Sequence, residues 1–263
     1  ANTTGTSNIA LGKDALGANT TGGANVAIGN AALDAITTEN DCTAVGNDSL
    51  GANTAAKNTA VGSASLSGNT SGTQNTGVGR LAGYVNTTGS NLAALGFEAL
   101  RGNTTGNDNT GIGAQALRTN TTGSANVGVG NSALRNSTTG DSNTAVGYLA
   151  LTANTTGANN TAVGANAGDA ITTGDLNVAV GLQALTVATT ADENTAVGAA
   201  AGRYIGSGQY NTAVGRSSLH SSVSGTTGQM TGDHNTSVGY ESLMDNTTGI
   251  DNVAVGSRAM TAS

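Results

Sequence analysis

The chain has 263 residues, a formal net charge of −7, 41 Gly, no Pro, no Trp and one Phe. The acidic balance argues against a nucleic-acid partner, which would need a basic surface. The shortage of large aromatic side chains excludes a thick globular core. No apolar run approaches the ~18 residues of a transmembrane helix, so no membrane insertion is expected.

One pentapeptide, typified by NTAVG at 58–62, recurs along the whole chain. Each copy closes on a glycine, and these closing glycines are, in chain order, Gly12, Gly29, Gly46, Gly62, Gly79, Gly96, Gly113, Gly130, Gly147, Gly164, Gly181, Gly198, Gly215, Gly239 and Gly256. Of the spacings between them, twelve are 17 residues, one is 16 and one is 24. This period predicts a single repeat array over residues 1–263, with an inserted loop near 220–232.

Each pentapeptide predicts a short β-strand. The residue before the glycine is always Val, Ile or Leu, the residue three before it is mostly Thr, and the residue four before it is mostly Asn. Because side chains alternate along a strand, the Thr and Val positions point one way, while the Asn position and the small residue between Thr and Val point the other. The third residue after the glycine is Ala or Ser, and the fourth is usually Leu. An NTTG turn then follows, as at 86–89.

Seventeen residues with several Gly and a β-branched segment are typical of neither a helical repeat nor a longer propeller blade. The sequence therefore predicts an all-β fold: a β-solenoid (β-roll or β-helix) of about fifteen 17-residue coils, with two short strands in each coil. Thin coils with invariant small residues favour side-by-side association, so a trimeric fibre is expected.

Stacking the coils in register would place equivalent residues over one another, and we call each such row a column. The Asn column predicts a ladder of side-chain amide hydrogen bonds, and the stacked Val and Leu predict dry apolar rows. The closing glycine is predicted to need a positive φ or a tight backbone passage. The residues assigned to this structural ladder are Asn58, Asn75, Asn109, Asn126, Asn143, Asn160, Gly113, Gly130, Gly147 and Gly164.

Departures from the repeat suggest local compensation. Gly replaces the usual Leu at 83, 168 and 202, and an apolar residue follows shortly after each one. We expect these apolar residues to refill the vacated space; they are Val85, Ile171 and Ile205. Cys42 stands where Asn is usual and is interpreted as a reduced thiol, with an interchain disulfide as the alternative.

Candidate functional residues are few. Arg101, Arg118 and Arg135 share one column in three successive coils, which suggests a short stripe for an anion or an acidic glycan, or three solvated guanidinium groups. His220 and His234 flank the expected loop and are interpreted as solvated rather than as metal ligands. Several Asn-x-Thr/Ser segments could carry N-linked sugar in a secreted chain, or simply form turns; they include Asn19, Asn86, Asn103, Asn120, Asn154 and Asn246.

The NTAVG pentapeptide resembles the head repeats of trimeric autotransporter adhesins, which carry an N-x-x-[AV]-[IV]-G core. It is more similar still to NTAxG/NTTG arrays of bacterial surface proteins and phage tail fibres. The resemblance covers the whole chain, although the 17-residue period is longer than that of the adhesin heads. It implies an extracellular, trimeric, β-rich shaft or adhesive segment, on a cell surface or a virion.

No paired carboxylates, catalytic triad or cysteine cluster stand out, so neither an enzyme nor a cofactor is expected. The leading hypothesis is a structural or adhesive segment of an extracellular fibre that self-assembles through stacked coils. Its partners would be further copies of the chain, as a homotrimer or an end-to-end filament, and surface glycans. The alternative is an ice-binding or glycan-binding solenoid, although Val and Ile dilute the Thr column and the paired Thr of the turn point to opposite faces.

Overall fold

A computed structural model describes residues 2–220 and 229–261 and confirms the predicted all-β solenoid. Contacts divide the chain into two compact units, 1–131 with strands β1 to β8 and 132–263 with strands β9 to β15. The strands are β1 (Ile9–Leu11), β2 (Val26–Ile28), β3 (Thr43–Val45), β4 (Thr59–Val61), β5 (Thr76–Val78), β6 (Ala93–Leu95), β7 (Thr110–Ile112), β8 (Val127–Val129), β9 (Thr144–Val146), β10 (Thr161–Val163), β11 (Val178–Val180), β12 (Thr195–Val197), β13 (Thr212–Val214), β14 (Thr236–Val238) and β15 (Val253–Val255).

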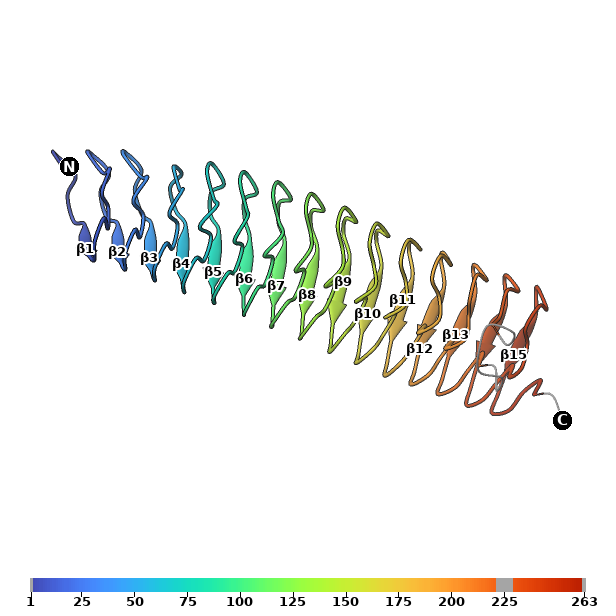
Figure 1. Cartoon of the computed structure of the whole chain (residues 1–263). Coiled ribbons are helices and arrows are strands. Elements are labelled where there is room, and N and C mark those ends of the chain that lie inside the picture. Colours follow the sequence, from blue (N-terminus) through green and yellow to red (C-terminus); the bar gives the residue numbers. More distant parts are fainter. Residues whose placement is uncertain (1, 221–228, 262–263) are drawn as a thin grey trace. The chain divides into compact units, whose positions relative to one another are not determined.

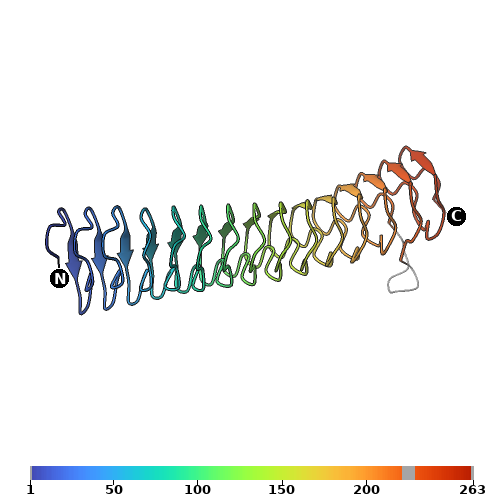
Figure 2. The same ribbon diagram turned by 90° about the horizontal axis from the view of Figure 1, so that it is seen from above.

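Each unit is a stack of coils that carry one strand apiece (Figure 1, Figure 2). Within a unit every strand pairs in parallel with the next strand along the chain, and equivalent residues face each other. In the first unit Thr59 faces Thr76 and Val61 faces Val78. In the second unit Thr195 faces Thr212 in the same way. The columns expected from the repeat are therefore real rows in each unit.

The expectation of two strands per coil is wrong for the described residues, because left-handed backbone interrupts the rest of the coil. The second and fourth residues after each closing glycine have φ near +55°, as in Asp48 (φ 56°) and Leu50 (φ 50°). A residue with this φ cannot continue an extended strand. The chain therefore bends twice within a few residues, which returns it toward the strand of the next coil.

The closing glycine meets both conditions expected of it. Gly113, Gly130, Gly147 and Gly164 have φ between 123° and 141°, a region that side-chain-bearing residues avoid. A Cβ atom on Gly147 would also overlap the carbonyl oxygen of Gly164 in the next coil. Stacked backbones thus pass too closely at this corner for any residue except glycine.

In the strand Asn column, four residues before the closing glycine, all six members assigned to the ladder are buried, whereas Asn8 and Asn252 are partly exposed. The expected amide-to-amide bonds join its members in the second unit, as from Nδ2 of Asn177 to Oδ1 of Asn160 at 3.1 Å. A second kind of bond, from backbone to side chain, links its members in both units. The backbone N–H of Asn75 donates to Oδ1 of Asn58 at 2.9 Å, and Nδ2 of Asn75 donates to the Gly89 carbonyl at 2.8 Å. The same backbone-to-Oδ1 bond joins Asn126 to Asn109 and Asn160 to Asn143.

In the first unit an amide-to-amide ladder also lies in the turn Asn column, the first residue of the NTTG turns. Here Nδ2 of four successive Asn residues donates to Oδ1 of the Asn one coil earlier, at 2.6–2.9 Å. In the first unit this ladder runs through Asn53, Asn69, Asn86, Asn103 and Asn120. All five side chains are fully buried.

Burial of the turn Asn column overturns the reading of these residues as glycosylation acceptors. The side chains of Asn19, Asn86, Asn103, Asn120 and Asn154 are 0% exposed. A glycan attached to any of them would have to displace the core. In the folded chain they are structural residues.

The apolar columns divide between inside and outside. The Leu column is buried, as with Leu66 and Leu100, but the Val column, expected to form a dry row, lies on the outer side of the strands. Val61 is 38% exposed and Val163 is also 38% exposed. The dry apolar interior is therefore built mainly from Leu and Ala.

Two of the three predicted compensations are found. Ile171 and Ile205 are buried, and their Cδ1 atoms lie beside Gly168 and Gly202, where a Cβ would contact them. The prediction for Val85 is wrong, because its side chain is 36% exposed. Val85 stands one position too early in the coil to reach the interior, and Leu66 of the preceding coil occupies the space at Gly83 instead.

Cys42 occupies the strand Asn column in the coil with the 16-residue spacing. The missing residue falls in the turn, where Ala55 takes the place of a Thr and a Gly. Sγ of Cys42 lies 3.3 Å from the Ala55 carbonyl, the counterpart of the turn carbonyl that Asn contacts in other coils. Burial raises the pKa of this thiol. The shortened turn and the unusual residue thus occur together in one coil.

The inserted loop falls mainly on residues 221–228, outside the described residues. On its C-terminal side, Met230 is buried and bridges to Ile205. The coil after the insertion therefore resumes contact with the stack at Met230.

Candidate functional site

The broadest candidate surface is the strand face, which we define as the outward side chains of the first and third residue of every strand. In the first unit these are Ile9, Leu11, Val26, Ile28, Thr43, Val45, Thr59, Val61, Thr76, Val78, Ala93, Leu95, Thr110, Ile112, Val127 and Val129. In the second unit they are Thr144, Val146, Thr161, Val163, Val178, Val180, Thr195, Val197, Thr212, Val214, Thr236, Val238, Val253 and Val255. Parallel in-register pairing turns each set into two continuous rows.

The strand face carries no charged residue in either unit. Solvated edges and faces of sheets usually carry Lys or Glu, which prevent unwanted contacts. Here the aliphatic row stays partly open, with Val78 39% and Val197 37% exposed. A neutral array of methyl and hydroxyl groups this regular suits a neutral, ordered contact better than a charged one.

Two rows of threonine differ in how their hydroxyl groups are used. In the turn Thr column, the second residue of the NTTG turn, Oγ1 donates to a backbone carbonyl of the next coil; Thr104 does so to Thr121 at 2.9 Å. The strand-face threonines form no such bond in the part of the chain that the structure describes: Thr43, Thr59, Thr76, Thr110, Thr144, Thr161, Thr195, Thr212 and Thr236. Their hydroxyl groups remain available to an external partner.

The structure gives the proposed arginine stripe a different electrostatic character. Nε of Arg118 lies 2.6 Å from Oε2 of Glu98, and Nε of Arg101 lies 3.8 Å from Oε1 of the same carboxylate. The hydrogen bond from Arg118 holds the pKa of Glu98 below its ordinary value. Arg135 belongs to the second unit and occupies the same position of its coil. At Arg101 and Arg118 the charge available to an external anion is reduced by Glu98.

The two histidines each pair with a tyrosine. His220 makes an edge contact with Tyr204 at 5.0 Å between ring centroids, and His234 stacks on Tyr210 at 4.9 Å. Burial and the nearby charge of Arg203 lower the pKa of His220. Within 2–220 and 229–261, no group of three or more His, Cys, Asp or Glu is arranged to hold a metal ion.

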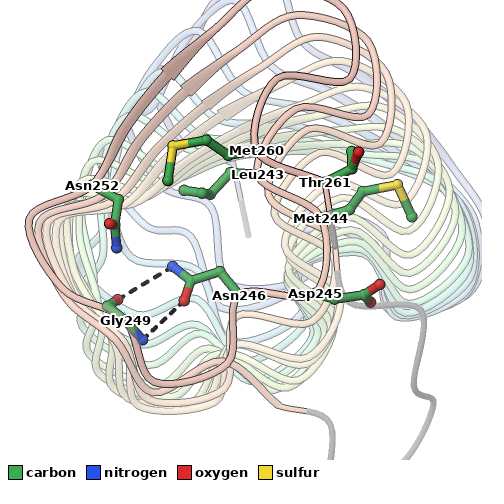
Figure 3. Close-up of a pocket in the computed structure, with 8 residues that line it drawn as sticks. All are labelled: Leu243, Met244, Asp245, Asn246, Gly249, Asn252, Met260 and Thr261. Carbon is green, nitrogen blue, oxygen red and sulfur yellow. Dashed lines mark hydrogen bonds between the residues drawn. The ribbon is translucent and has the colours of Figure 1, made fainter. Parts of the chain in front are cut away.

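A recess lies at the last described coils (Figure 3). It is lined by Leu243, Met244, Asp245, Asn246, Gly249, Asn252, Met260 and Thr261. Asn246 exchanges two hydrogen bonds with Gly249, of 3.2 and 2.9 Å. The first of these, from Nδ2 to the Gly carbonyl, recurs in other turns, as from Asn103 to Gly106. The Leu and Asn side chains that line the recess belong to columns that are buried in other coils. The recess is therefore the interior of a coil and offers no distinct chemistry.

No protein-family model matches the chain, and no match was found among curated protein sequences. In the described residues no helix has the length and apolar character needed to cross a bilayer. The strand face and the internal ladders are therefore the features from which function has to be argued.

Proposed function

We propose that the chain is a structural and adhesive segment of an extracellular fibre, of the surface-adhesin or tail-fibre shaft type. The observation that carries the proposal is the unbroken chain of coil-to-coil bonds within each unit. In the first unit the turn Asn ladder, the strand Asn column and the parallel strands all link successive coils. A load along the stack is shared by many short bonds in parallel, which is a mechanical rather than a catalytic role.

The partner in this proposal is the chain itself, as a homotrimer, an end-to-end filament or both. Solenoid coils bury only a thin interior, and association of several copies would add to it. Outward positions that vary between coils, such as Phe97, Tyr148 and Arg216, would supply contacts to surface glycans.

The experiment is the mass of the purified chain by multi-angle light scattering, with negative-stain images of the same sample. Discrete particles of three chains, or filaments, are expected. A protein that stays monomeric at micromolar to millimolar concentration would contradict the self-assembly part of the proposal. Rapid digestion of the native chain by a nonspecific protease, outside 221–228, would contradict the mechanical part.

A further inference from the structure

We propose that the strand face binds crystalline water, so that the chain adsorbs to ice. This inference goes beyond the fibre proposal and does not depend on it, since either unit presents the surface by itself. It rests on three properties of the face: its repeat distance, its neutral chemistry and its free hydroxyl groups.

The repeat distance of the face is close to that of ice. Neighbouring strands lie about 4.8 Å apart, and the in-register pairing of Thr195 with Thr212 carries that spacing to the side chains. Tetrahedral water with O···O distances of about 2.8 Å places second-neighbour oxygens about 4.6 Å apart. The two repeats differ by about 0.2 Å per strand, so several successive strands can stay matched to one ice row.

The chemistry of the face suits water held in a lattice. Methyl groups of Thr and Val cannot hydrogen-bond, so the water over them keeps its bonds to other water molecules. Hydroxyl groups such as those of Thr161 and Thr195 are free of internal bonds and can each join such a layer. Because the groups sit on paired strands, they are already ordered before ice is met, which reduces the entropy lost on contact.

Other occupants fit the face less well. A charged ligand would find no countercharge among the thirty strand-face residues. Sugars commonly stack on aromatic rings, and the strand face has none. A second copy of the chain could cover the aliphatic row, but burying the free Thr hydroxyls in that contact would leave them without partners, at a cost.

The test measures thermal hysteresis and ice-crystal shape for the full chain and two double variants. Thr161→Lys with Thr195→Lys places two charges on the strand face. Thr156→Lys with Thr190→Lys adds the same charge at exposed turn positions of nearby coils. Unfolding midpoints and light scattering are recorded for all three proteins.

The proposal expects measurable hysteresis and faceted crystals from the native chain, a severalfold loss in the strand-face variant and little change in the turn variant. Two results would overturn it directly: no ice shaping by the folded native chain, or an equal loss of hysteresis in both variants. A third would be a native oligomer that does not shape ice and that dissociates only in the strand-face variant. The last result would assign the face to a second copy. The fibre proposal is judged separately, by the particle mass.

Discussion

The side-chain amide of Asn103 donates a hydrogen bond of 2.9 Å to Oδ1 of Asn86, seventeen residues earlier, and neither side chain is exposed to solvent. The same Asn103 donates to the Gly106 carbonyl at 3.0 Å. Its own Oδ1 accepts hydrogen bonds from Asn109 and Asn120, at 3.2 and 2.8 Å. One side chain thus joins three coils and both Asn columns.

Replacing Asn103 with Ala should therefore be strongly destabilising. Four hydrogen bonds are lost, and buried groups of Asn86 and Asn120 lose a partner, which gives an expected cost of about 3–5 kcal/mol. Chemical denaturation measures it. Thr105→Ala, at an exposed position two residues away, should cost less than about 0.5 kcal/mol. Similar stability for the two variants would mean that the ladder does not hold the coils together.

Gly147→Ala tests the corner at the closing glycine. Its φ of 141° and the overlap of a Cβ with the Gly164 carbonyl predict a loss of about 3 kcal/mol or more. Gly23→Ala is the matched control, because other coils carry Ala at that position, as at Ala56 and Ala158. The comparison is made by thermal unfolding. Equal midpoints for both variants would show that the backbone relaxes freely at the corner.

The two threonine rows predict opposite responses to one isosteric change. Thr104→Val removes the donor to the Thr121 carbonyl, which should cost about 0.5–1.5 kcal/mol. Thr110→Val, on the strand face, removes a hydroxyl that makes no internal bond, and Val already occupies this position at Val127. It should be neutral or slightly stabilising. A larger loss for Thr110→Val in denaturant titrations would contradict the assignment of free hydroxyls.

Cys42 should react only when the protein unfolds. Its side chain is fully buried, and burial raises the pKa of the thiol, so little thiolate is exposed to reagent. Thiol labelling under native conditions should be slow and should follow the unfolding curve in denaturant. Stoichiometric labelling of the native chain within minutes, or a disulfide-linked dimer on nonreducing gels, would show that the coil opens at this point.

Glu98 should add to stability above its ordinary pKa of 4.5 and lose that contribution in acid. Its pKa is lowered in the folded state by Arg118, so the stabilisation fades as the pH falls through that lowered value. Glu98→Gln should flatten the pH dependence of unfolding below pH 4.5. Glu193→Gln is the control, because Glu193 is exposed and has no ion pair in the described residues. Identical pH dependence of unfolding for both variants would show that the contact between Glu98 and Arg118 does not stabilise the fold.

Much of the fold follows from the repeat. An Asn, a small residue, an aliphatic residue and a glycine recur at a nearly constant spacing, and only stacked, in-register coils give each of them the same surroundings fifteen times. The glycine could be assigned a special backbone conformation for the same reason. The position of every strand could be predicted in this way from residues such as Thr59, Val61 and Gly62.

The candidate surface could be predicted from the sequence only in part. The sequence separated inward from outward positions within a strand, but it did not show that the strand-face threonines are free while the turn threonines are bonded. It also gave no reason to expect amide-to-amide bonds along the turn Asn column in the first unit and along the strand Asn column in the second. Both distinctions depend on which atoms of the next coil lie within about 3 Å.

By itself the sequence determined the period, the strands and the closing glycines of this protein, since local alternation and repetition fix them. The tertiary structure alone decided the rest. Left-handed residues such as Asp48 and Leu50 bend each coil, and those bends determine that there is one strand per coil, that Ile171 reaches the interior while Val85 does not, and which hydroxyl groups face water. Such bends arise at ordinary residues that adopt positive φ only because the stacked coils hold them there.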